Sequence, residues 1–250
     1  MNSKSVNFKL FGFTFMEFSP LQYIVLTAIA MFFYTGGNLI DPSSPGYSFW
    51  TNFFSDLGRT VSLSGKPNLI SFTIFMITAL ILGISFTFYI CLFPSLFKQN
   101  KKSRTIAVIG SLIGFIFCIG LFGTILTPWD LLYKEHLLFA NIFNISGLLV
   151  LIFYSIAILL EKNYPNKFAI ALTILLIIGI TYSIILINLP KNLNLQTLTI
   201  QATSQKFSQY FFLICFSFQG FGAKKQAQKI QPVVINLKND KLKTITREIN

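Results

Sequence analysis

The chain has 250 residues, of which 53% are hydrophobic and only 11% are charged. Soluble domains carry about 25% charged residues, so this composition excludes an ordinary soluble domain, a disordered chain, a collagen-like fibre and a coiled coil. The formal net charge of +12 would suggest nucleic-acid binding in a polar chain. In an apolar chain it indicates instead which loops face the cytoplasm. No nucleic-acid-binding motif accompanies the charge, and we expect no nucleic-acid partner.

Six segments are apolar enough to cross a bilayer as helices, which takes about 20 residues each. The Phe-rich residues 1–19 precede them. No small-residue cleavage site of a signal peptide follows the first apolar run, so we expect that run to be a retained first helix. We expect the lead before it to lie at the membrane interface. The sequence predicts an all-α, polytopic integral membrane protein with a six-helix membrane domain over residues 20–222 and a basic tail over residues 223–250. The expected spans are 20–40, 69–93, 105–127, 136–160, 168–189 and 199–222.

Lysine and arginine predict the orientation of these spans. Fifteen of the 20 basic residues lie in the lead, the loop 94–104, the loop 161–167 and the tail, which all fall on one side of the membrane. Cytoplasmic loops are enriched in basic residues, so both termini are predicted to be cytoplasmic. The tail is either solvated or in contact with anionic headgroups of the inner leaflet. Membrane lipids are therefore the expected partners.

The first outer loop, residues 41–68, is long and rich in aromatic residues. Loops of this length are usually functional or disordered, and the aromatic content argues against disorder. We expect the loop to fold back on the membrane surface, with a short helix near 48–56. It carries Asp56 and Arg59. Asp56 is either a functional acid or a turn and N-cap residue, because aspartate followed closely by glycine favours turns.

Further polar residues lie at the outer ends of the fourth and sixth spans. His136, the only histidine, opens the fourth span, and Asp130 precedes it. His136 is either an interfacial residue or a proton shuttle, since histidine titrates near neutral pH. Gln205 and Gln209 share a face of the sixth span. Lys206 between them is an intramembrane charge that either has a partner or reaches the interface along its own stem.

Several of these residues resemble a family signature. Phe54-Ser55-Asp56-Leu57-Gly58, just ahead of the second span, is similar to the Ser-Asp-x-Gly motif of the Frag1/DRAM/Sfk1 superfamily, and the prokaryotic relatives of unknown function look closest. The six-span layout, His136 in Lys-Glu-His and the Gln205-Lys206 pair agree with the resemblance. It implies a place in the plasma membrane of a prokaryotic cell. Eukaryotic members act in lipid remodelling of GPI-anchored proteins and in autophagy, but fold does not fix function.

The residues support two functional hypotheses. In the first, an outer-leaflet site binds or modifies a lipid headgroup, with Asp56 and His136 as catalytic residues and Arg59 and Lys206 holding a phosphate. Asp130, Gln205 and Gln209 complete the binding residues. In the second, the protein is a non-enzymatic sensor, scaffold or small-solute transporter. The sequence leaves open whether the protein is an enzyme. One histidine is too few for a zinc site, and no cofactor motif is present, so neither a metal nor a cofactor is expected.

Overall fold

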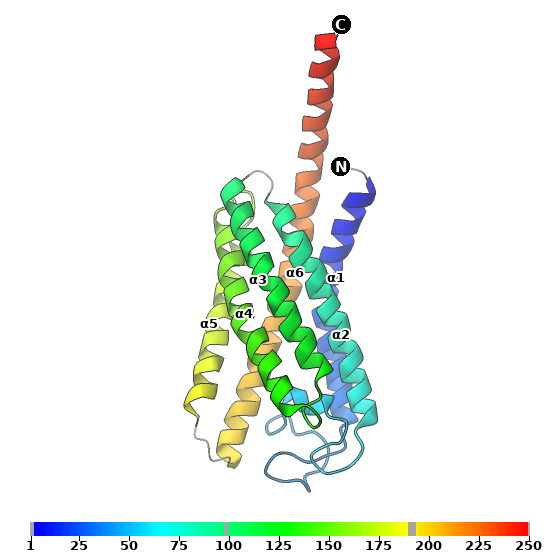
Figure 1. The fold of residues 1–250 in the computed structure, drawn as a ribbon, viewed down its shortest axis with the longest axis vertical. Helices are drawn as coiled ribbons and strands as arrows, with labels where there is room; N and C mark the ends of the chain where they lie inside the picture. Colours follow the sequence, from blue (N-terminus) through cyan, green and yellow to red (C-terminus); the bar gives the residue numbers. More distant parts are fainter. Residues whose placement is uncertain (1–2, 98–99, 190–193, 250) are drawn as a thin grey trace.

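The computed structural model describes residues 3–97, 100–189 and 194–249. Within these ranges the chain is all-helical, with no strand. The α-helices run alternately up and down in one bundle, and both chain ends lie at the same end of it (Figure 1). We call this the terminal end and the opposite one the loop end. The helices are α1 (Ser3–Phe32), η1 (Phe54–Gly58), α2 (Leu69–Leu92), η2 (Phe93–Leu96), α3 (Lys101–Leu126), α4 (Tyr133–Leu159), α5 (Lys167–Asn188) and α6 (Leu195–Ile249).

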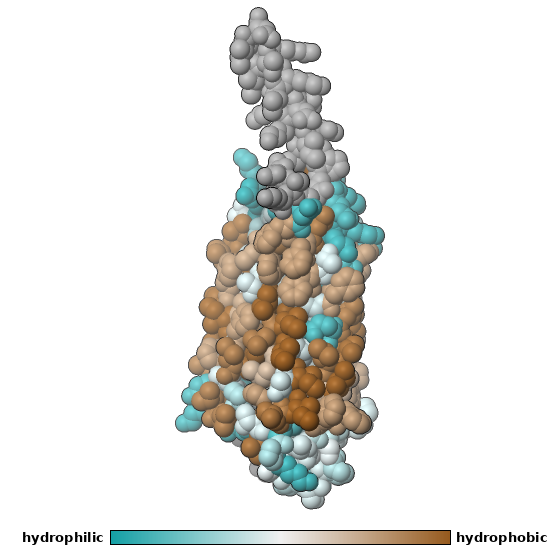
Figure 2. All heavy atoms as spheres, turned by 90° about the vertical axis from the view of Figure 1, so that its right-hand side faces the viewer, coloured by the Kyte–Doolittle hydropathy of each residue, from teal (hydrophilic) through white to brown (hydrophobic). Residues whose placement is uncertain are grey.

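Five helices in the described part, α1 to α5, are long and apolar enough to cross a membrane. Their outward side chains form a hydrophobic belt between two more hydrophilic ends (Figure 2). In water such a large exposed apolar surface would cause aggregation, whereas in a membrane the lipid chains cover it. The prediction of an all-helical, multi-pass membrane protein is therefore confirmed. α6 is long enough to span, but its first turns are too polar for it to belong to the apolar set.

The first helix differs from its predicted bounds at both ends. Residues 3–19, expected as a separate interfacial lead, continue directly into the first span as α1. Pro20, at the junction of the lead and the span, lies inside this helix and does not end it. At its other end α1 stops at Phe32 rather than near residue 40. After three non-helical residues, Gly36 and Gly37 adopt positive φ angles of 107° and 84°, a backbone that is open to glycine and does not continue a helix.

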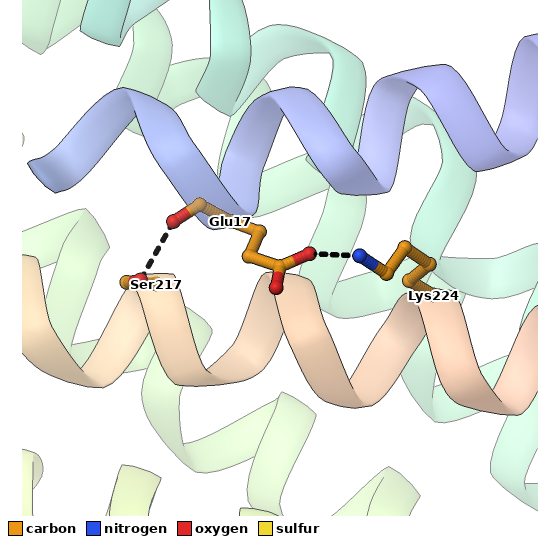
Figure 3. A network of polar contacts seen from close by, with 3 residues as sticks. All are labelled: Glu17, Ser217 and Lys224. Carbon is orange, nitrogen blue, oxygen red and sulfur yellow. Dashed lines mark hydrogen bonds and ion pairs between the residues drawn. The ribbon is translucent and has the colours of Figure 1, made fainter. Parts of the chain in front are cut away.

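α1 and α6 cross at very short range about midway along α1. A β-carbon at Gly220 would lie 2.4 Å from the backbone nitrogen of Glu17, so only glycine fits. Next to this crossing the Ser217 hydroxyl donates to the Glu17 carbonyl at 2.6 Å, and Lys224 forms an ion pair with the Glu17 carboxylate (Figure 3). The predicted lead and the predicted tail are thus joined inside the bundle. This crossing fixes α6 against α1.

Candidate functional site

Residues 33–68 close the loop end of the bundle, and we call them the cap. The short helix expected near 48–56 is absent over residues 48–53, which form a turn, and a 3-10 helix, η1, follows at Phe54–Gly58. Asn52 holds the cap together, because its side-chain nitrogen donates to the Gly37 carbonyl at 2.8 Å and to Asp56 Oδ2 at 3.1 Å. The cap is therefore a folded structure with a buried polar centre.

Asp56 lies in that buried centre and is 3% exposed. Its Oδ2 accepts from Asn52 and from the backbone nitrogen of Phe53, the latter at 2.8 Å. Burial raises the pKa of the Asp56 carboxyl, and these two hydrogen bonds oppose the shift. Phe53 is the N-cap residue of η1, and Asp56, the third residue of that helix, accepts from its backbone nitrogen. Asp56 therefore has the turn role that the sequence offered as one alternative, but it is not the N-cap residue.

Lys206 projects from α6 into the cap and is fully buried. Its Nζ donates to the carbonyl oxygens of Asn52 and Ala202, the second at 3.2 Å. The ammonium also faces the rings of Tyr47 and Phe49 at 5.5 and 5.2 Å from their centroids. Lys206 therefore neither snorkels to the interface nor points at a ligand, but ties the cap to α6.

Asp130 joins the cap to the connection between α3 and α4. Its carboxylate accepts from the Thr60 hydroxyl at 2.5 Å, from the Thr60 backbone nitrogen at 3.0 Å and from the Val61 backbone nitrogen at 2.9 Å. Partial burial raises the pKa of Asp130, but these hydrogen bonds outweigh it and leave the pKa below its usual value. Nearby, Arg59 Nε donates to the Val61 carbonyl at 3.1 Å.

His136 lies beneath the cap at the start of α4 and is 7% exposed. Its Nδ1 is 2.7 Å from the carbonyl oxygen of Thr127, and its ring lies 5.5 Å from the ring of Trp129. A carbonyl can only accept, so Nδ1 carries the proton. In the neutral ring Nε2 then holds the lone pair. The expected interfacial role and a role toward a ligand are both compatible with this position.

A cavity of about 210 Å³ runs inside the bundle below the cap. Its lining residues on α4 extend from His136 to Tyr154, or about 27 Å along the helix axis at 1.5 Å per residue. The part toward the loop end carries most of the polar side chains, among apolar neighbours such as Phe54, Phe75 and Ile125. These polar residues are Ser55, His136, Asn144, Tyr182, Gln205 and Gln209. The deeper part is apolar, with Leu82, Phe86, Ile90, Leu151, Leu175 and Phe216 on its wall.

The seven predicted site residues thus fall into two groups. His136, Gln205 and Gln209 line the cavity. Asp56, Arg59, Asp130 and Lys206 do not line it, and each makes its hydrogen bonds within the cap or between the cap and its neighbours. Gln205 belongs to both groups, because its Oε1 also accepts from the Phe54 backbone nitrogen at 2.9 Å.

Sequence reasoning missed Tyr182 and Ser183, which bring the α5 side of the wall its polar groups. Their signal was weak, consisting of three adjacent hydroxyl residues, Thr181 to Ser183, in a mostly aliphatic span. Ser55 was noted only as part of a motif. Its Oγ is buried and has no hydrogen-bond partner in the structure. No cluster of three or more His, Cys, Asp or Glu residues able to hold a metal occurs among the residues described.

No family model, curated protein or solved structure matches the chain. The class of protein therefore follows from the fold itself. The chain is a helical, multi-pass membrane protein, with a folded cap at one end of the bundle and an internal cavity beneath the cap.

Proposed function

We propose that this protein binds a single-chain amphiphilic lipid in its internal cavity, with the polar end of the lipid under the cap. In this proposal α6 is the sixth span, both termini are cytoplasmic and the cap lies on the outer face of a prokaryotic plasma membrane. The distribution of basic residues supports that orientation. Kinship with the Frag1/DRAM/Sfk1 superfamily is part of the same proposal, and the place of Ser55–Gly58 between the first two spans agrees with it.

The observation that carries the proposal is the change of polarity along the cavity. Polar side chains from the cap and from α4, α5 and α6 converge at the loop end, whereas aliphatic and aromatic side chains line the remainder. Binding pockets combine mostly apolar walls with a few convergent polar groups. A ligand with a polar head and an apolar tail matches this wall better than a uniformly polar solute does.

The volume of the cavity further limits which ligands are possible. Pockets for drug-sized ligands occupy about 300–1,000 Å³, and this cavity of about 210 Å³ is smaller. It is nevertheless long, because its wall follows α4 from His136 to Tyr154. This space is too small for the paired chains of a bilayer phospholipid, and a single flexible chain would fill it only in part, with the rest of the chain leaving it between the helices.

The site is better suited to binding a lipid than to converting it chemically. Catalysis by proton transfer needs an acid or base next to the reacting group. Apart from tyrosines, His136 is the one side chain on the described wall of the cavity that titrates. Asp56 or Asp130 was expected to act with it, but Oδ2 of Asp56 accepts from Asn52 and Phe53, and Asp130 accepts from Thr60 and Val61. The geometry therefore favours a binding protein over an enzyme.

Native mass spectrometry of the protein purified in mild detergent tests this proposal. We expect a co-purified lipid of single-chain mass on the unaltered protein. Ser183→Trp, which fills the cavity wall, should remove the lipid, whereas Thr181→Trp on the exposed side of the same helix should retain it. Equal lipid content in both variants, or a diacyl lipid as the bound species, would contradict the proposal.

A further inference from the structure

We infer that the ligand of the cavity carries an uncharged, hydroxyl-bearing headgroup rather than a phosphate or carboxylate. This inference rests on the proposed function and names the class of lipid. It rests on two properties of the described cavity wall, namely the absence of charged side chains and the presence of several uncharged hydrogen-bonding groups.

The first step concerns charge. None of the described residues that line the cavity is Asp, Glu, Lys or Arg. The nearest basic side chain on α6, Lys206, points into the cap and donates to the carbonyls of Asn52 and Ala202. Arg59 is directed at the Val61 carbonyl. No lysine or arginine of the described wall is therefore placed to balance a bound anion.

The second step is the cost of placing an anion there. Taking a charge out of water without a partner costs several kcal/mol even after relaxation of the protein. A phosphate head beneath the cap would carry this full desolvation cost. For an uncharged head the cost is limited to the hydrogen bonds that it fails to make. The wall therefore selects against anionic single-chain lipids, among them the phosphate ligand that Arg59 and Lys206 were expected to hold.

The third step concerns the groups that the wall offers. Ser55 brings a buried hydroxyl without a partner, which can both donate and accept. Gln209 and Asn144 bring amides, which also do both, and neutral His136 offers an acceptor at Nε2. A ligand hydroxyl also donates and accepts, so it can satisfy several of these groups together. An ester without a hydroxyl can only accept.

Three probes with the same oleoyl chain separate these features. They are 1-monooleoylglycerol, its 3-phosphate (oleoyl lysophosphatidic acid) and methyl oleate, each titrated onto the purified full chain and read by native mass spectrometry. We expect 1-monooleoylglycerol to bind at least tenfold more tightly than the phosphate and about fivefold more tightly than methyl oleate. Equal or tighter binding of the phosphate overturns the inference on charge, and equal binding of methyl oleate overturns the inference on hydroxyl recognition.

Either of those results would leave the proposed function standing, whereas failure of all three probes to bind would contradict the proposed function as well. A matched pair of variants on α6 tests whether the wall reads the headgroup. Gln209→Leu should remove most of the preference for 1-monooleoylglycerol over methyl oleate. Gln201→Leu, the same change at a position outside the cavity wall, should leave that preference unchanged. An unchanged preference in Gln209→Leu would contradict recognition at this end of the cavity.

Discussion

The latch between Asp130 and the cap gives the sharpest prediction on stability. In Asp130→Asn the side chain keeps its shape but loses its charge and replaces one acceptor oxygen by an amide that donates. Three donors then lose a charged acceptor, namely the hydroxyl and backbone nitrogen of Thr60 and the backbone nitrogen of Val61. A hydrogen bond to a charged group contributes about 1.5–3 kcal/mol when buried.

Water reduces that figure at this site, because Val61 is 43% exposed and solvent can replace part of what is lost. We therefore expect the free energy of cap opening to fall by about 2–3 kcal/mol, or about 30- to 140-fold in the opening equilibrium. Hydrogen exchange of a peptide covering residues 57–62, measured by mass spectrometry, should show this loss of protection. Asp41→Asn is the matched control, since Asp41 accepts only from nearby groups of its own exposed turn.

The same latch gives a pH dependence of defined sign. The pKa of Asp130 in the folded protein lies below its ordinary value of 3.8. Its contribution is therefore complete above about pH 4 and is lost as the pH falls through the lowered pKa. Unchanged protection in Asp130→Asn, or an equal loss in Asp41→Asn, would refute the view that this carboxylate holds the cap.

Two further predictions concern the bundle and its orientation. Gly220→Ala should lower the melting temperature, because its β-carbon meets the α1 backbone and overpacking costs about 1–3 kcal/mol. In the control Gly179→Ala the new β-carbon meets only the end of a leucine side chain, so this variant should be neutral or stabilising. A lower melting temperature for Gly179→Ala than for Gly220→Ala would contradict the close crossing. For the proposed topology, Ser43→Cys in the cap should react with a membrane-impermeant maleimide on intact cells, whereas Asn166→Cys at the terminal end should react only after permeabilisation. Labelling of Asn166→Cys on intact cells would invert the orientation.

The spans were predictable from the sequence because lipid imposes a simple requirement of length and apolarity. For α2 to α5 the helices begin and end within four residues of the predicted bounds. The bounds of α1 were not predictable from hydropathy alone. It ends at Phe32, before the non-helical Gly36 and Gly37, and from Ser3 onward it runs through Pro20 without a break.

The candidate site was predictable in composition but not in geometry. Polar residues near the outer boundary could be found from the sequence, and His136, Gln205 and Gln209 do line the cavity. The direction of Lys206 could not be found, because it depends on a carbonyl of Asn52, which is 154 residues away in the chain. Asp56 is similar, since its partners are set by the fold of the cap. Spacing on one helix cannot reveal contacts between distant segments.

The content of the cavity in an experimental density map tests the central claim most directly. A cryo-electron microscopy map of the unaltered protein in a lipid nanodisc should show elongated density with its polar end beside Gln205 and Gln209. From there the density should extend between the helices toward Tyr154. An empty cavity, ordered water along its full length, or density only on the outer surface of the bundle would contradict the account.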